Sequence, residues 1–587
     1  MIFLQLLIRR ERANPNAYGK FLRVALVVLG LLLAPASVSA KAAADDAFLH
    51  VSRGAVASDS AAASAAGVAI LRAGGNAVDA ACAAALALGV VDPFASGLGG
   101  GGFALVYLAK TGKVVALDFR ETAPMAIASR AGETSPWTPQ TGLSVGVPGE
   151  PSGLDELVRR FGALPFSRCV TPALRLARGF LVSPWLAKQI RDEIERHPTT
   201  ASDLIAKIFS VKAEVAAKIR AGDRVLRPDL AKTLERLRRE GARAFYRGDI
   251  ARAIVAETTA AGGVLSLEDL ARYTPVERTP LETRFLGRRV VTMPPPSAGG
   301  VIIVEALGIL SNRIATLQHD RVQTSPAYFH LVAEALKHGF ADRARYLGDP
   351  GFVHVPLEHL LDPAYHRELS MRIRSDHVLA HDAYGTPSTS PARPARDGGT
   401  AHISVVDREG NAVALTTTIN LEFGARIVAG GTGIVLNDQM DDFTPAGDRP
   451  DVFSLQGSDA NRAAPGKRPV SSMSPTIVLG DSGVELVAGA AGGPRIVSAT
   501  LQILLDVLVF GLDARQAVEA PRIHHQWEPD ELFYESGLPA EVARSLDKIG
   551  HTTKPRLDIG KANVILRSEA GLDAAADPRS GGAPSGY

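Results

Sequence analysis

Cysteine is nearly absent from this chain of 587 residues, which contains only Cys82 and Cys169. Two cysteines allow one disulfide at most, so a disulfide framework cannot be the basis of the fold. Both lie in apolar segments with helical spacing, "NAVDAACAAALALGV" and "SRCVTPALRLA", and neither has the spacing of a metal ligand. We therefore expect two buried free thiols.

An excess of charge of one sign is also missing. Lysine and arginine number 64 and aspartate and glutamate 62, which leaves a formal net charge of +2. Such a balance gives no global field that would attract nucleic acid, and we expect no nucleic-acid partner. The hydrophobic fraction of 46% and the charged fraction of 21% are those of a folded globular protein.

The apolar run "VALVVLGLLLA" (Val24 to Ala34) has 11 residues, well short of the roughly 20 that span a bilayer. Basic residues precede it, and Pro35 and the small residues "ASVSA" follow. This pattern is typical of a signal peptide. We expect residues 1–40 to be removed and the mature protein to be periplasmic or secreted.

Several common catalytic motifs are missing as well. The glycines at 99–102 lack the Gly-Lys-Ser/Thr ending of a phosphate-binding loop, so they indicate close backbone packing or a turn that faces the substrate. No Gly-x-Ser-x-Gly elbow occurs with a plausible triad. His524 and His525 have no third ligand at a recognisable spacing, which favours a structural role over a metal site.

The remaining pattern indicates helices and strands in blocks. Residues 61–89 have helical spacing broken by "GGN", which predicts two packed helices, and two strands follow around "KTGK". Residues 155–275 are helical and charged, with a capping box at "SLED". "MPPPSAGG" predicts a rigid turn in which Ser297 has no evident partner. The segment 384–399, rich in proline and serine, predicts no regular structure.

A hairpin is predicted directly after that segment, around the turn 407–411. Continuing the pairing from this turn places Thr400 opposite Thr418, with Cβ atoms roughly 5 Å apart if no bulge intervenes. Because strand side chains alternate, Thr416 and Asn420 lie on the same face. Thr400 could be an ordinary strand start, or part of a site that brings a hydroxyl and an amide together.

Three charged or amide side chains are candidates for binding a ligand. Arg120 follows a strand in "LDFRETAP" and could clamp a carboxylate or form a structural ion pair. Gln439 and Asp442 in "NDQMDDF" could face a cationic group or belong to an ordinary turn. Taken singly, each of these signals is weak.

Two further loops offer hydrogen-bond donors. "KRPVSSMSPT" carries adjacent hydroxyls at Ser471 and Ser472, and "AGAAGGPRI" carries two glycine N–H groups at Gly492 and Gly493. Adjacent backbone donors are what an oxyanion requires, although most Gly-Gly pairs are only loops.

Taken together and in order, the motifs of this chain resemble the gamma-glutamyltransferase family. The resemblance runs from about Ala55 to Tyr587 and rests on "GGNAVDAA", "GLGGGGF", "DFRETAP", "GVPG", "ERTPL", "MPPPSAGG", "GTAHISVVDREGNAVALT", "GIVLNDQMDDF", "KRPVSSMSPTIV", "AGGPRIVSATLQ", "APRIHHQW" and "AADPR". It implies an α+β fold of the N-terminal nucleophile hydrolase type, with four αββα layers in which helices flank two stacked antiparallel sheets. It also implies a precursor that cuts itself into a large subunit, 41–399, and a small subunit, 400–587, which pair as a heterodimer.

The resemblance further assigns roles to residues, with no cofactor and no metal. Thr400 is implied to be the nucleophile and Thr418 the residue that supports its hydroxyl. The implied oxyanion hole consists of Gly492 and Gly493. The remaining implied contacts are to the substrate: Arg120, Ser471 and Ser472 to its α-carboxylate, and Asn420, Gln439 and Asp442 to its α-ammonium.

The implied substrates are small molecules, glutathione and other γ-glutamyl compounds, with water, amino acids or dipeptides as acceptors. Three departures from the family pattern, at Ala401, Pro494 and Phe453, affect the expected rate and acceptor preference more than the reaction type. Two alternatives are an acylase of the glutaryl or cephalosporin type and a non-catalytic relative that binds γ-glutamyl ligands. Retention of Asp442 argues against the first, because a glutaryl group has no ammonium, and retention of Thr400 argues against the second.

Overall fold

The computed structural model of the chain describes residues 47–130, 141–314, 324–387, 398–445 and 449–587. The expected signal peptide, 1–40, and most of the proline-rich segment, 388–397, lie outside the described residues. Within the described ranges, no helix has both the length and the apolar character required to cross a membrane.

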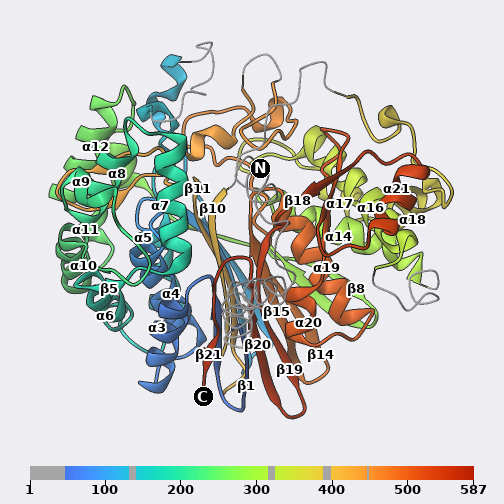
Figure 1. The fold of residues 1–587 in the computed structure, drawn as a ribbon, viewed down its shortest axis with the longest axis horizontal. Coiled ribbons are helices and arrows are strands. Elements are labelled where there is room, and N and C mark those ends of the chain that lie inside the picture. The colour runs from blue at the N-terminus through green and yellow to red at the C-terminus, as the bar shows by residue number, and fades with distance from the viewer. Residues whose placement is uncertain (1–46, 131–140, 315–323, 388–397, 446–448) are drawn as a thin grey trace, which may run out of the picture. The chain divides into compact units, whose positions relative to one another are not determined.

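The centre of the fold consists of two stacked antiparallel sheets (Figure 1). The first sheet has the order β21 (Ser585–Gly586), β2 (Ala55–Ser58), β10 (Gly398–Val406), β11 (Ala412–Leu421), β3 (Gly101–Leu108), β4 (Lys113–Phe119) and β7 (Val276–Arg278). The second has the order β1 (Phe48–Val51), β20 (Gly571–Ala576), β19 (Lys561–Ser568), β15 (Gly483–Ala491), β14 (Thr476–Gly480), β9 (Arg288–Thr292) and β8 (Leu281–Phe285).

The two faces of the first sheet bury different layers of the core, as β3 illustrates. Phe103 and Leu105 belong to the hydrophobic cluster shared with the second sheet. Ala104 and Val106, which point the other way, belong to the cluster shared with the helices that cover the first sheet. Since strand side chains alternate, β2, β4, β10 and β11 join both clusters in the same way. The sheet is therefore buried on both faces.

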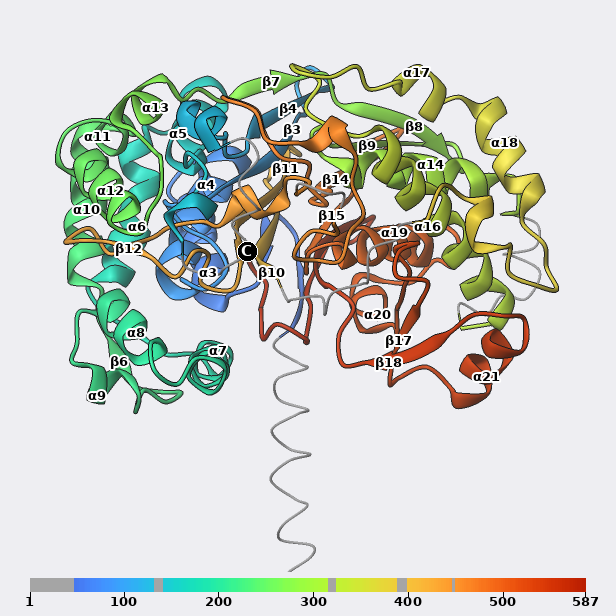
Figure 2. The ribbon, with the colours of Figure 1, turned by 90° about the horizontal axis from the view of Figure 1, so that it is seen from above.

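Helices from the first half of the chain cover the outer face of the first sheet (Figures 1 and 2). They are α3 (Ala61–Arg72), α4 (Ala77–Val91), α5 (Glu150–Phe161), α6 (Phe166–Ala177), α7 (Pro184–Arg196), α8 (Ala201–Phe209), α9 (Ala213–Ala216), α10 (Pro228–Glu240), α11 (Arg243–Tyr246), α12 (Asp249–Ala260) and α13 (Leu267–Arg272). The innermost, α4, packs on β10 and β11 and buries every residue except Gly89. Its alanines permit this close approach.

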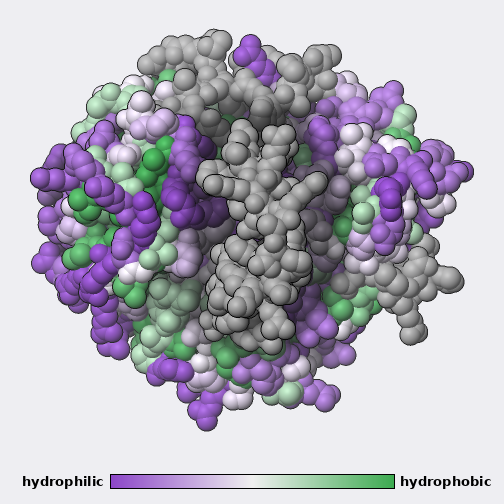
Figure 3. Space-filling model, in the orientation of Figure 1, coloured by the Kyte–Doolittle hydropathy of each residue, from purple (hydrophilic) through white to green (hydrophobic). Residues whose placement is uncertain are grey.

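A second helical layer covers the outer face of the second sheet, so that the fold has the four αββα layers and the α+β class that were predicted (Figure 2). Its helices are α14 (Ala298–Ser311), α16 (Pro326–Tyr346), α17 (Leu357–Leu360), α18 (Pro363–Arg372), α19 (Arg495–Leu508), α20 (Ala514–Glu519) and α21 (Ala540–Lys548). Hydrophilic side chains cover much of the flanks of both layers in the view of Figure 3.

Smaller sheets lie at the margins. They are β5 (Phe180–Leu181) with β6 (Arg224–Val225), β12 (Val428–Ala429) with β13 (Ile434–Val435), and β16 (Ile523–His524) with β17 (Leu532–Glu535) and β18 (Thr553–Arg556).

The local predictions of helices agree with the structure. Asn76 caps α4 and forms a capping box with Asp79, so "GGN" separates α3 from α4 as expected. Ser266 and Asp269 form the predicted capping box of α13. Both cysteines are free and buried, as predicted.

Ser297 does have partners, contrary to the sequence reading. Its hydroxyl caps α14 by accepting from the N–H of Gly300, and it donates to the carbonyl of Met473 at 2.7 Å. "MPPPSAGG" is thus attached to the loop that contains Ser471, which donates its N–H to Pro296 and accepts from Ala298. A contact between segments 176 residues apart could not be inferred from the sequence alone.

Candidate active site

The predicted register of the β10–β11 hairpin is confirmed: Thr400 pairs with Thr418, and the pairing continues unshifted to the turn. A β-bulge lies between Gly399 and Thr400, immediately beyond the predicted pair. A Cβ on Gly399 would lie 2.4 Å from the carbonyl oxygen of Leu421, so only glycine fits there. The extra residue of the bulge is Ile419 on β11, which lies opposite the peptide bond that precedes Thr400.

The two threonine hydroxyls form a short chain of hydrogen bonds. Thr418 Oγ1 lies 2.9 Å from Thr400 Oγ1 and donates to the carbonyl oxygen of Gly399 at 2.8 Å. Because Thr418 has one hydroxyl proton, Thr400 is then the donor in the bond between the two hydroxyls. Thr418 also accepts from the N–H of Asn420 at 2.9 Å, which fixes its position. Thr418 thus contacts both the Thr400 hydroxyl and the preceding carbonyl.

A small pocket opens beside Thr400. The predicted site residues that line it are Arg120, Thr400, Thr418, Asn420, Gln439, Asp442, Ser471, Ser472 and Gly493. Gly492 is adjacent in the chain but does not line the pocket. Residues from separate parts of the sequence are therefore brought together as predicted, and the two threonines lie in the same pocket as a cation and an anion.

Arg120 and Asp442 bind each other in this structure through a buried ion pair. Gln439 donates from Nε2 to the same carboxylate oxygen at 2.7 Å, while the other oxygen of Asp442 has no hydrogen-bond partner. Burial raises the pKa of Asp442, and Arg120 opposes that rise. A ligand with a carboxylate and an ammonium could separate the pair and satisfy both charges.

A second carboxyl group lies next to Arg120. Glu121 Oε2 is 3.8 Å from Arg120 Nη1, and neither oxygen of Glu121 has a hydrogen-bond partner. Burial raises the pKa of Glu121 to about 8, with Arg120 opposing the shift. Arg120 therefore has one ionised partner, Asp442, and one neighbour that is mostly protonated at neutral pH.

The loop that carries Gln439 and Asp442 is held by its first residue. Asn437 donates to the carbonyls of Gly99 and Gly146 at 2.7 and 3.0 Å and accepts from the N–H of Gln439. A Cβ on Gly99 would lie 2.0 Å from the carbonyl oxygen of residue 435, which explains the glycine there. Close backbone packing is thus the role of this part of the glycine run.

The two serines differ in their contacts. Ser471 is buried, and its hydroxyl accepts from the N–H of Met473 at 3.1 Å. Ser472 is half-buried and lines the pocket beside it. Both lie in the loop that is anchored to "MPPPSAGG" before α14, so the start of that helix helps to place the hydroxyls.

Gly492 and Gly493 lie between β15 and α19, with φ angles of +128° and +59°. These values belong to the region that favours glycine. The Gly493 nitrogen lies 3.1 Å from the position that a Cβ on Gly398 would occupy, next to the bulge. The positive end of the α19 dipole follows immediately. This is a suitable place for a developing negative charge.

Two charged residues that were not predicted from the sequence, Arg343 and Asp451, also line the pocket. Arg343, from α16, lies with its Nη2 3.6 Å from Asp451 Oδ2, and Asp451 Oδ1 accepts the N–H groups of Phe453 and Leu455. Burial raises the pKa of Asp451 to about 7, and Arg343 opposes the rise. The ring of Phe453 lies over Gly493. This pair therefore holds the loop 451–455 over the pocket.

The comparisons with known proteins agree with this arrangement. The family described as Gamma-glutamyltranspeptidase matches residues 63–587. A glutathione hydrolase proenzyme of Escherichia coli (strain K12) is 39% identical over 549 residues, covering 91% of each chain. One of Pseudomonas aeruginosa is 39% identical over 572 residues, covering 94% of this chain and 97% of its own. The solved cephalosporin acylase of Bacillus halodurans superposes with a TM-score of 0.79 at 28% identity, over 92% of this chain and 97% of that chain.

Proposed function

Since this chain belongs to the gamma-glutamyltranspeptidase family, we propose that it is a glutathione hydrolase and γ-glutamyltransferase that matures by cutting itself. The observation that carries the proposal is the pocket in which the Thr400–Thr418 pair faces the Arg120–Asp442 pair. A γ-glutamyl head group has an α-carboxylate and an α-ammonium at one end and the scissile carbonyl at the other. The pocket offers a partner for each.

Self-cleavage would occur at the bond between Gly399 and Thr400. The Thr400 hydroxyl attacks the Gly399 carbonyl carbon and its proton passes to Thr418, while Thr418 donates to the carbonyl oxygen that becomes negative. The amide nitrogen takes that proton from Thr418 and leaves as the α-amine of Thr400, and water hydrolyses the resulting ester between the Gly399 carbonyl and the Thr400 hydroxyl oxygen. The hydrogen bonds of Thr418 to both groups support the step.

The mature Thr400 would act as both nucleophile and base. Its freed α-amino group, with a reference pKa of about 8, takes the hydroxyl proton. The hydroxyl attacks the γ-carbonyl, and the N–H groups of Gly492 and Gly493 receive the oxyanion. The leaving amine departs with a proton, and the γ-glutamyl ester on Thr400 then passes to water or to the amine of an amino acid or dipeptide.

Substrate binding would replace one ion pair by two. The α-carboxylate takes Arg120 with help from Ser471 and Ser472, and the α-ammonium takes Asp442. The ammonium is also offered the oxygens of Gln439 and Asn420. Gln439 Oε1 has no hydrogen-bond partner in the structure, which supports this role.

The two products of cleavage, 41–399 and 400–587, would remain paired as a heterodimer. Each central sheet contains strands from before and after Thr400: β10 and β11 lie between β2 and β3 in the first, and β14 pairs with β9 in the second. Separating the subunits would break both sheets and expose their cores.

Export to the periplasm or medium follows from the leader at 1–40, and N-terminal sequencing near residue 41 tests it.

A cephalosporin or glutaryl acylase is the second candidate, favoured by the structural similarity to the Bacillus halodurans enzyme. The matched substrates γ-glutamyl-p-nitroanilide and glutaryl-p-nitroanilide differ only in the α-amino group. Purified wild-type protein should hydrolyse the first with a kcat/KM at least tenfold higher, because only it can use Asp442. An equal or higher value for the glutaryl compound would favour the acylase.

A further inference from the structure

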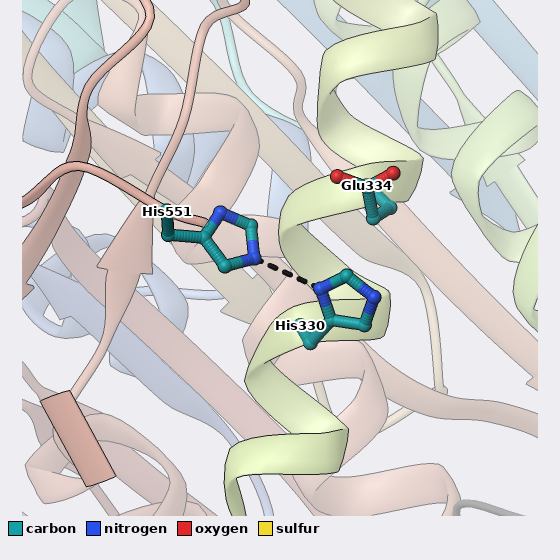
Figure 4. Close-up of side chains that lie close together, drawn as sticks. All are labelled: His330, Glu334 and His551. Carbon is teal, nitrogen blue, oxygen red and sulfur yellow. Dashed lines mark hydrogen bonds between the residues drawn. The ribbon is translucent and has the colours of Figure 1, made fainter. Parts of the chain in front are cut away.

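A buried cluster of two histidines and a glutamate lies outside the pocket that surrounds Thr400 (Figure 4). His330 and Glu334 are one turn apart on α16, and His551 follows α21. All three are buried, and one ligand-type atom of each lies within 4.8 Å of the other two. We propose that these three side chains bind a divalent transition metal ion, Zn²⁺ by preference.

The hydrogen bonds of His330 leave one ring nitrogen for the metal. Its Nε2 lies 2.6 Å from the carbonyl oxygen of Arg374, which can only accept, so Nε2 carries the proton. The lone pair of Nδ1 therefore points at His551, whose Nε2 lies 2.9 Å away. A backbone carbonyl that fixes the tautomer and the ring orientation is the usual second partner of a metal-binding histidine.

The two histidine nitrogens need to move little to bind one zinc ion. Zinc binds imidazole nitrogens at about 2.0–2.1 Å, and a tetrahedral site separates them by about 3.3 Å. The two nitrogens must therefore part by roughly 0.4 Å. The neutral His551 ring keeps one proton, which moves from Nε2 to Nδ1, an atom that is buried without a hydrogen-bond partner.

Glu334 supplies the third ligand. Its Oε2 accepts from the Tyr384 hydroxyl at 2.7 Å, while Oε1 has no hydrogen-bond partner and lies 3.7 Å from the buried ammonium of Lys337. Asp530 shares that ammonium at 3.5 Å. Asp530 also lies 3.3 Å from both His525 and His381. Lys337 is the ammonium nearest to Glu334, and a divalent cation would add a second positive partner for that carboxylate. A tetrahedral site keeps its fourth position for water.

The three residues of the site come from both sides of the proposed cleavage site. His330 and Glu334 precede Gly399 in the chain, whereas His551 follows it. If the cut of the proposed function is made, the metal would link the two subunits at a point far along the chain from the cleavage site. Metal binding itself does not depend on that cut, so its failure and the failure of the proposed function are distinguishable.

Cobalt provides the test, because Co²⁺ takes zinc ligand sets and absorbs visible light. Untagged full-length protein, stripped with a chelator, should bind one Co²⁺ per chain with a saturable absorption band that added Zn²⁺ removes. His551→Gln and Glu334→Gln should each weaken binding by about 10- to 100-fold or more. His381→Gln is the matched control, since His381 lies nearby, 3.3 Å from Asp530, but is not one of the three ligands.

Folding and thermal stability are measured beside metal binding. Far-UV circular dichroism shows whether each variant folds, and Zn²⁺ should raise the unfolding temperature of wild type and His381→Gln but not of His551→Gln. A wild-type protein with no saturable Co²⁺ band overturns the proposal, whatever the variants do. Folded His551→Gln and Glu334→Gln proteins that bind cobalt as tightly as wild type also overturn it.

Discussion

Replacing Asp442 by asparagine should remove the carboxylate that we propose receives the substrate's α-ammonium, while it keeps the size of the side chain. Asp442 is buried between Arg120 and Gln439 in the pocket. A hydrogen bond to a charged group contributes about 1.5–3 kcal/mol, so kcat/KM for γ-glutamyl-p-nitroanilide should fall about 10- to 150-fold. The glutaryl analogue lacks the ammonium and should lose little or nothing.

Arg120→Lys should behave differently, because both substrates carry the α-carboxylate. An ammonium cannot reproduce the bidentate contacts of a guanidinium, so kcat/KM should fall for both compounds by a similar factor. Asp451→Asn is the matched control for a buried carboxylate in the same pocket. It faces Arg343 rather than the proposed ammonium position, so the ratio between the two substrates should stay near that of wild type.

The substitution also tests the pairing seen in the structure. Asp442→Asn leaves the buried guanidinium of Arg120 with Glu121, at 3.8 Å, as its nearest acid. Removing one partner of a buried pair typically costs 3–5 kcal/mol, and Glu121 should limit the loss to about 3 kcal/mol by ionising. Thermal unfolding of each variant measures this. If Asp442→Asn lowered kcat/KM equally for both substrates, Asp442 would act on the pocket as a whole and not on the ammonium.

Two other substitutions test separate parts of the site, and a third tests the buried carboxyl of Glu150, which accepts from the Thr417 hydroxyl. Thr418→Ala should accumulate uncut precursor on a denaturing gel, because Thr418 joins the Thr400 hydroxyl to the Gly399 carbonyl; processing at the wild-type rate would remove Thr418 from the step. Gly493→Ala should lower kcat about 10²- to 10³-fold. The φ of +59° at this position is strained for alanine, and the added Cβ would lie 2.9 Å from the Phe453 ring. A wild-type kcat in this variant would exclude Gly493 from the oxyanion hole. Burial raises the pKa of Glu150 from 4.5 to about 8. The native state therefore keeps a proton that the unfolded chain loses above pH 4.5. The free energy of unfolding should fall by up to about 1.4 kcal/mol per pH unit as the pH rises from 4.5 to about 8. Glu150→Gln should flatten that slope in thermal unfolding at several pH values, and an unchanged slope would contradict the assignment.

The hairpin at Thr400 could be predicted because the residues that determine it are close together in the sequence. The turn 407–411 sets the register, and strand alternation then places Thr400 opposite Thr418. Only the bulge beyond this pair was not predicted, since it depends on the tight contact of Gly399 with Leu421. The order of the motifs along the chain, through the family resemblance, predicted the αββα layers, and it named many of the residues that line the pocket.

Contacts between distant segments could not be read from the sequence. Arg120 and Asp442 are 322 residues apart, and their direct pairing depends on how β4 and the loop 437–443 meet. Arg343 gave no signal, because α16 carries it among many buried residues and only the packed fold brings it to Asp451. The same holds for the cluster of His330, Glu334 and His551, because His551 is 221 residues from His330 and only the packed fold brings it to α16.

The central claim is that Thr400 is the nucleophile that cuts the chain and then carries the γ-glutamyl group. Intact-mass spectrometry of purified wild-type protein, beside Thr400→Ala prepared in the same way, tests it most directly. We expect two chains from wild type, the smaller beginning at Thr400 and ending at Tyr587, and one folded, inactive chain from Thr400→Ala. An active wild-type protein that remains a single chain, or a Thr400→Ala protein cut as efficiently at the same bond, would contradict the account.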